Sequence, residues 1–124
     1  MTNLLLDTSI LIGYLRNQPA AVAYVEATAD QQILSAIVVA ELYGGVREGK
    51  ERASLDALIA TYTVLPITSG LAVEAGLLWR QYRPRHGVGL ADALLAATTL
   101  AHGLTLVTLN WKHFPMLPDL VVPY

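Results

Sequence analysis

The sequence predicts one α/β domain over residues 1–124, a three-layer α/β/α sandwich with a short central parallel sheet. Two observations lead to this prediction. Short apolar segments alternate with longer helical patterns along the whole chain. In addition, 54% of the residues are hydrophobic and only 15% are charged, as expected where a sheet is covered on both faces. The 124 residues suffice for one domain with a sizeable core and are too few for two.

The expected strands are short, and the expected helices between them are ended by glycine or proline. Strands are predicted at residues 4–6, 32–34, 62–65, 104–108 and 120–122. Helices are predicted at residues 10–17, 20–29, 36–47, 50–61, from 68 or 69 to about 82, and 90–102, with a helical turn at 110–114. Ser9 and Ser35 are the expected N-caps of the first and third helices, and residues 83–89 are expected to form a loop.

Composition excludes several classes of protein. The chain contains no cysteine, which rules out a disulfide framework and a thiolate metal site. It begins without the basic segment of a signal peptide and has no apolar run long enough to span a bilayer, so a cytoplasmic protein is expected. The formal net charge of −2 argues against a generally basic nucleic-acid-binding surface, although a local basic patch remains open.

Asp7 directly follows the first apolar segment and precedes Thr8 and Ser9. This order predicts a buried strand, a turn and a helix, with Asp7 at the carboxyl end of the strand. Ligands of open parallel sheets bind just outside that end. The alternative is that Asp7 itself caps the helix.

Two further carboxylates stand alone in apolar helical segments. Glu41 has only apolar or small residues three and four positions away, and Asp92 is the one charge in the predicted helix 90–102. A buried carboxylate costs several kcal/mol unless it is paired, protonated or bound to a cation. The alternatives are that Glu41 lies on an exposed helix edge and that Asp92 favours the helix dipole.

Asn110 lies just past the strand at 104–108, and so shares a sheet edge with Asp7. The helices that carry Glu41 and Asp92 begin at the same edge. Three converging carboxylates repel one another, and a hard divalent cation with oxygen ligands relieves this repulsion. Without cysteine or a suitably spaced histidine pair, Mg²⁺ or Mn²⁺ is expected rather than Zn²⁺.

Four segments in this order resemble the motifs of PIN-domain proteins, and more narrowly the VapC-type toxins of bacterial and archaeal toxin–antitoxin pairs. The segments are LLLDTSILI, SAIVVAELYGG, GVGLADALLAAT and TLVTLNWKHF. The resemblance implies an acidic site at Asp7, Glu41 and Asp92, with Asn110 at the fourth position. His113 stands where many relatives have a further aspartate, so one well-bound ion and at most a weak second are expected.

The resemblance also implies a function. It predicts a Mg²⁺-dependent endoribonuclease, with Mg²⁺ held by Asp7 and Asp92, and by Glu41 directly or through water. A VapB-type antitoxin would hold the enzyme inactive, and a homodimer or a larger toxin–antitoxin assembly is expected. Because of Asn110 and His113, a PIN-fold module that binds RNA or protein and blocks translation without cutting is the alternative. A phosphoryl-accepting receiver domain is a third interpretation, but the paired acids expected beside its acceptor aspartate are absent.

The densest group of basic residues comprises Arg80, Arg83, Arg85 and His86. These residues are candidates for contacts with RNA phosphates or with the antitoxin. The alternative is a solvated helix end that favours cations because of the helix dipole.

Overall fold

A computed structural model describes residues 3–124, so Met1 and Thr2 of the predicted domain lie outside the described residues. Its sheet has four parallel strands in the order β3-β2-β1-β4. The strands are β1 (Leu4–Leu6), β2 (Gln32–Ser35), β3 (Val64–Leu65) and β4 (Thr105–Val107). The predicted α/β class and short parallel sheet are therefore confirmed.

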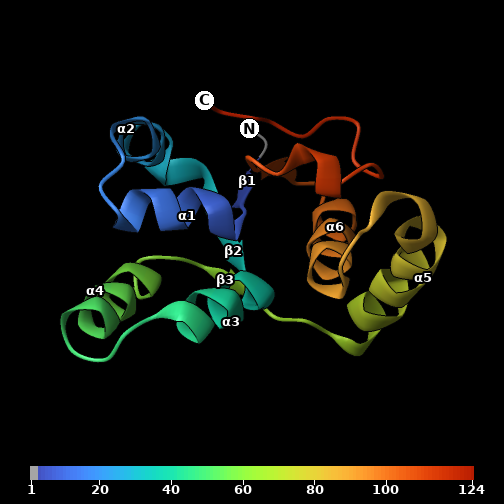
Figure 1. The fold of residues 1–124 in the computed structure, drawn as a ribbon, viewed down its shortest axis with the longest axis horizontal. Helices are drawn as coiled ribbons and strands as arrows, with labels where there is room; N and C mark the ends of the chain where they lie inside the picture. Colours follow the sequence, from blue (N-terminus) through green and yellow to red (C-terminus); the bar gives the residue numbers. More distant parts are fainter. Residues whose placement is uncertain (1–2) are drawn as a thin grey trace.

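Six α-helices surround the sheet within the described residues. They are α1 (Thr8–Leu15), α2 (Pro19–Ala27), α3 (Ala36–Gly45), α4 (Lys50–Ile59), α5 (Ser69–His86) and α6 (Leu90–His102). Two short 3₁₀ helices, η1 (Ala29–Gln31) and η2 (Trp111–His113), complete the fold. Helices α1 and α2 lie on one side of the strands and α5 and α6 on the other, with α3 between them at the end of β2 (Figure 1).

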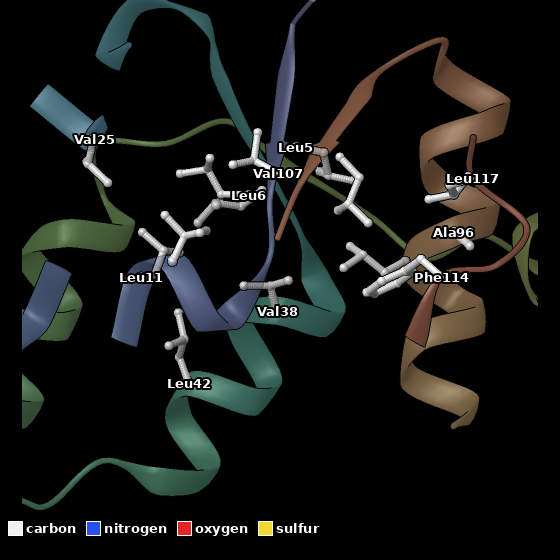
Figure 2. Close-up of a cluster of buried hydrophobic side chains, with 14 of the residues drawn as sticks. Leu5, Leu6, Leu11, Val25, Val38, Leu42, Ala96, Val107, Phe114 and Leu117 are labelled. Carbon is white, nitrogen blue, oxygen red and sulfur yellow. The ribbon is translucent and has the colours of Figure 1, made fainter. Parts of the chain in front are cut away.

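The core occupies both faces of the sheet because successive strand residues point to opposite faces. Leu5 and Leu6 of β1 are both completely buried. Figure 2 shows the cluster running from Leu11 on one side of the strands to Phe114 and Leu117 beside α6 on the other. No helix in residues 3–124 is long and apolar enough to cross a membrane.

The first helix begins earlier than predicted. It starts at Thr8 rather than residue 10, and its N-cap is Asp7 rather than Ser9. The Asp7 carboxylate accepts a hydrogen bond from the Thr8 backbone N–H at 2.7 Å. Aspartate and serine are equally good caps, so this choice depends on tertiary contacts that the local sequence does not show.

Helix α5 extends to His86, whereas the sequence predicted its end near Tyr82 and a loop from 83 to 89. Pro84 lies inside the last turn, where a missing N–H costs only one intrahelical bond. Gly87, at φ 61°, then ends the helix by donating its N–H to the carbonyl of Arg83.

Most other boundaries differ from the prediction by one or two residues, and the C-terminal strand differs most. Helix α3 ends at Gly45 rather than at residue 47. The expected final strand at 120–122 is reduced to a single bridge between Val107 and Val121. This bridge nevertheless holds the C-terminal segment beside β4, because the Val121 N–H donates to the carbonyl of Leu106 at 2.8 Å.

Candidate active site

Asp7 lies where β1 ends and α1 begins, and its side chain is only 7% exposed. Oδ1 accepts the Thr8 N–H, while Oδ2 accepts the hydroxyls of Thr108 at 2.6 Å and Ser9 at 3.3 Å. Asp7 is thus both the helix cap of the alternative interpretation and a buried anion at the carboxyl edge of the sheet.

Thr108 connects the ends of two neighbouring strands. It is completely buried, donates to Asp7 and accepts the Asn110 backbone N–H at 2.9 Å. Sequence reasoning did not single out this residue. The available signal was a hydroxyl directly after an apolar strand, at the position where parallel pairing sets β4 beside β1.

Glu41 lies on α3 and is exposed, which agrees with the alternative of a helix edge rather than with burial on an apolar face. No other group lies close to Gly44 or Gly45, because nothing is found within 4 Å of a Cβ built on either residue. The Glu41 carboxylate is still directed to the site, since Oε1 accepts the Thr8 hydroxyl at 2.8 Å. Thr8 therefore contacts Asp7 through its backbone and Glu41 through its side chain.

Asp92 lies in the first turn of α6, and Oδ2 accepts the Gly89 N–H at 3.2 Å. His113 Nδ1 lies 3.5 Å from the same oxygen. Burial raises the pKa of Asp92, and the charge of Asp7 raises it further; the Gly89 N–H and His113 act in the opposite direction. The influence of Asp7 means that these two carboxylates share one electrostatic environment.

The fourth predicted position, Asn110, is exposed. Its backbone is used locally, because its N–H donates to Thr108 and its carbonyl accepts the His113 N–H at 2.9 Å. Asn110 therefore positions the turn that carries His113 towards Asp92. The Asn110 side chain makes no hydrogen bond within residues 3–124.

The acidic groups do not form a ready-made metal cage. Within residues 3–124, no three acidic or histidine side chains are grouped closely enough to hold an ion. The structure instead relates the carboxylates in pairs. Thr8 hydrogen-bonds to both Asp7 and Glu41, and the negative charge of Asp7 contributes to the raised pKa of Asp92. The assignment of Asp7, Glu41 and Asp92 as ligands of one ion remains a prediction. Their chemistry suits a hard cation, because all three offer carboxylate oxygens.

The basic group at the end of α5 is exposed at Arg80, Arg83 and Arg85. Arg83 lies over the indole of Trp79, 4.1 Å from the ring centroid, and the indole N–H donates to the carbonyl of Val88. Arg83 and Arg85 are in the last turn of α5, where the helix dipole favours cations. Both interpretations of this group, nucleic-acid contact and helix-end stabilisation, remain compatible with the structure.

Comparison with known proteins places this fold and site in a family. The PIN domain family matches residues 4–117. The chain belongs to the PIN-domain proteins. It belongs within them to the VapC family, as shown by ribonuclease VapC19 of Mycobacterium tuberculosis, which is 39% identical over 97% of this chain and 98% of its own length. Ribonuclease VapC10 of the same species is 40% identical over 98% of this chain and 92% of its own length.

Solved structures show the same relationship. A toxin–antitoxin complex from Klebsiella pneumoniae superposes with a TM-score of 0.83 at 29% identity and covers 98% of both chains. VapBC2 from Rickettsia felis, bound to a DNA fragment from its promoter, gives a TM-score of 0.75 at 27% identity over 95% of both chains. The predicted family and three-layer architecture are confirmed.

Proposed function

We propose that this protein is an endoribonuclease toxin that hydrolyses RNA phosphodiester bonds, depends on a divalent metal and is neutralised by a cognate antitoxin. The observation that carries the proposal is the carboxyl edge of the sheet. There the buried Asp7 carboxylate is held by the Thr8 N–H and the Thr108 hydroxyl, and the Asp92 carboxylate, whose pKa is raised mainly by burial, is held by the Gly89 N–H. Two neighbouring carboxylates of this kind attract a cation. The relatives named above as ribonucleases support RNA as the substrate. A cytoplasmic location is part of the same proposal.

Asp7 and Asp92 are the proposed direct metal ligands, and Glu41 acts directly or through water. A bound Mg²⁺, or Mn²⁺ in its place, supplies positive charge that stabilises the developing charge on the phosphate and lowers the pKa of water. Asp7 is held for this role by Thr108 and by the Thr8 N–H. Asp92 keeps its place through the Gly89 N–H.

Glu41 is the proposed general base. It is exposed and therefore reachable by the attacking water and by substrate. The Thr8 hydroxyl fixes one oxygen, Oε1, while Oε2 makes no hydrogen bond within residues 3–124. A carboxylate with one oxygen held and one available can orient and deprotonate a water molecule.

A VapB-type antitoxin is the proposed protein partner, supported by the toxin–antitoxin complexes among the structural neighbours. A pocket of about 590 Å³ lies between α1, α3 and α4. It is lined by apolar side chains including Ile12 and Leu15, by Arg16 and Arg47, and by Glu41 itself. An antitoxin segment seated there would cover the proposed base and thereby block cleavage.

The experiment that tests this function incubates purified protein, free of antitoxin, with total tRNA in Mg²⁺ or in EDTA. Discrete fragments in Mg²⁺ and none in EDTA support the ribonuclease. RNA binding without fragments in either buffer would support the alternative, a PIN-fold module that blocks translation without cutting. The absence of a preformed three-ligand cluster in residues 3–124 is the observation that favours this alternative.

A further inference from the structure

A second pocket, of about 560 Å³, is lined by residues of η2 and of the segment that follows it, and takes no part in the chemistry described above. Its floor is apolar and includes Phe114 and Leu117, which are 2% and 7% exposed. Its rim contains Trp111, Lys112 and His86. The pocket therefore combines a flat aromatic face, an apolar floor and two basic side chains.

Helix η2 joins this pocket to the acidic site. Its three residues divide between the two, because His113 is directed towards Asp92 while Trp111 and Lys112 line the pocket. A 3₁₀ helix rises about 2 Å per residue. Trp111 and His113, the residue beside the Asp92 carboxylate, therefore lie within one turn of each other. A ligand in the pocket is thus a neighbour of anything bound at Asp92.

Charge distinguishes this pocket from the one between α1, α3 and α4. That larger pocket is lined by Glu41 and Glu51 as well as by basic residues. Among the described residues that line the pocket beside η2, none is acidic. An anionic ligand with an apolar, planar part fits this combination.

Trp111 is the strongest single feature of the pocket. Its side chain is 53% exposed, although tryptophan is a large apolar residue, and the Lys112 ammonium lies 5.5 Å from its ring centroid. Exposed aromatic faces beside a positive charge are the recurring means by which proteins bind bases of single-stranded nucleic acid.

We propose that this pocket binds one unpaired base of the RNA, stacked on Trp111, in a nucleotide next to the phosphate at the acidic site, with Lys112 and His86 facing its phosphate. The proposal rests on the proposed ribonuclease function and adds to it a subsite for one unpaired base, formed by this chain's own Trp111 and the pocket beside η2. It also makes Trp111 a binding residue.

The test measures binding of fluorescently labelled single-stranded oligoribonucleotides to the full chain in EDTA, so that cleavage does not interfere. We expect Trp111→Ala to weaken binding about tenfold, equivalent to about 1.4 kcal/mol, and Trp111→Tyr to restore most of the loss. Lys112→Ala should lower the slope of log affinity against log salt by about 1. The control is Leu100→Ala, an equally exposed apolar residue at the far end of α6.

An oligonucleotide with abasic sites separates stacking from phosphate contact. We expect wild type to bind it as weakly as Trp111→Ala binds the intact RNA. Three results would overturn the proposal. They are unchanged affinity of Trp111→Ala for intact RNA, a loss on Trp111→Ala that is as large for abasic RNA as for intact RNA, and a change of oligomeric state without loss of RNA binding. Because this measurement needs no catalysis, it stands even if the tRNA experiment shows no cleavage. If binding depends on the base but the tRNA experiment in Mg²⁺ shows no cleavage, the ribonuclease function is refuted while the base-binding pocket is supported.

Discussion

At the scale of single residues, Thr108 makes Asp7 a fixed anion. Both oxygens of Asp7 are engaged, and the shortest of these hydrogen bonds comes from the buried hydroxyl of Thr108. Residues that orient a ligand side chain commonly change metal affinity or activity by 10- to 100-fold when they are removed. Thr108 should therefore influence catalysis without touching substrate.

We predict that Thr108→Val lowers the free energy of unfolding by about 1–3 kcal/mol, because it removes a buried hydrogen bond to a charged group. It should also lower the rate of RNA cleavage about tenfold. Urea denaturation and a cleavage assay measure the two effects. Thr98→Val is the matched control, since Thr98 is equally buried but bonds only to the carbonyl of Leu94 in its own helix. Equal cleavage by the two variants would refute the role of Thr108.

Asp92 is the residue whose replacement should separate activity from stability. We predict that Asp92→Asn abolishes cleavage and growth inhibition, leaves the fold intact and raises the melting temperature in metal-free buffer. The reason is that it removes a half-buried charge that Asp7 opposes. Circular dichroism and a growth assay with the variant test this. Undiminished growth inhibition would count against the site.

The raised pKa of Asp92 also fixes the sign of a pH dependence. A carboxyl whose folded pKa exceeds its ordinary value of 3.8 favours folding fully below that value, and this contribution is lost as pH rises through the folded pKa. Metal-free wild type should therefore lose stability relative to Asp92→Asn in the pH range just above 3.8. Melting curves of both proteins in EDTA, at a series of pH values, measure the difference. A difference that is independent of pH would contradict the prediction.

At the scale of elements, several helix boundaries could be predicted because the signals are local. Ser35 caps α3 by accepting the Ile37 N–H, Thr68 caps α5, and Gly103 ends α6 in the left-handed conformation. The choice between Ser9 and Asp7 as the cap of α1 stayed open in the sequence, because Asp7 is held by Thr108, which is 101 residues away in the chain. The extension of α5 to His86 was missed because Pro84 indicated a loop, whereas the helix continues through Pro84 and ends only at Gly87.

The end of α5 carries a prediction about RNA. We expect Arg83→Ala combined with Arg85→Ala to weaken RNA binding at all sequences and to lower the salt slope by about 2, because each arginine neutralises one phosphate. Titrations at several salt concentrations measure the slope. The control is Arg16→Ala with Arg47→Ala, which lie in the pocket proposed for the antitoxin. Unchanged RNA binding and cleavage in the Arg83 and Arg85 variant would leave these residues as a helix end favoured by the dipole.

At the scale of the whole molecule, parallel topology accounts for how much of the site could be predicted. Strand order puts β1 beside β4, so Asp7 and the residues after β4 had to share one edge. Glu41 is exposed rather than buried on an apolar face, because a helical pattern gives the neighbours of a residue on its own helix but not the elements that cover it. Thr8 and Thr108 were missed because a hydroxyl is common in any sequence, and only tertiary contacts show what it bonds.

The predicted homodimer needs an apolar surface that a second copy of the chain can cover. Val73 and Leu77 are 61% and 45% exposed and lie four positions apart on α5, so they share one helix face. Closed two-fold dimers are the commonest way to bury such a face. We predict a homodimer in solution that Val73→Asp with Leu77→Asp converts to a monomer. Light scattering at micromolar concentration tests this, and a stable wild-type monomer without antitoxin would refute it.

The most direct measurement is the rate of cleavage of one single-stranded RNA as a function of Mg²⁺ concentration. It compares wild type, Asp92→Asn and Glu74→Gln, in which an exposed acid on α5 away from the site is neutralised. If Asp7 and Asp92 bind the catalytic ion, wild type and Glu74→Gln should show the same saturable dependence on Mg²⁺, and Asp92→Asn should stay inactive at every concentration. Cleavage by wild type in EDTA, or a rate for Asp92→Asn equal to that of Glu74→Gln, would contradict a metal-dependent site at these carboxylates.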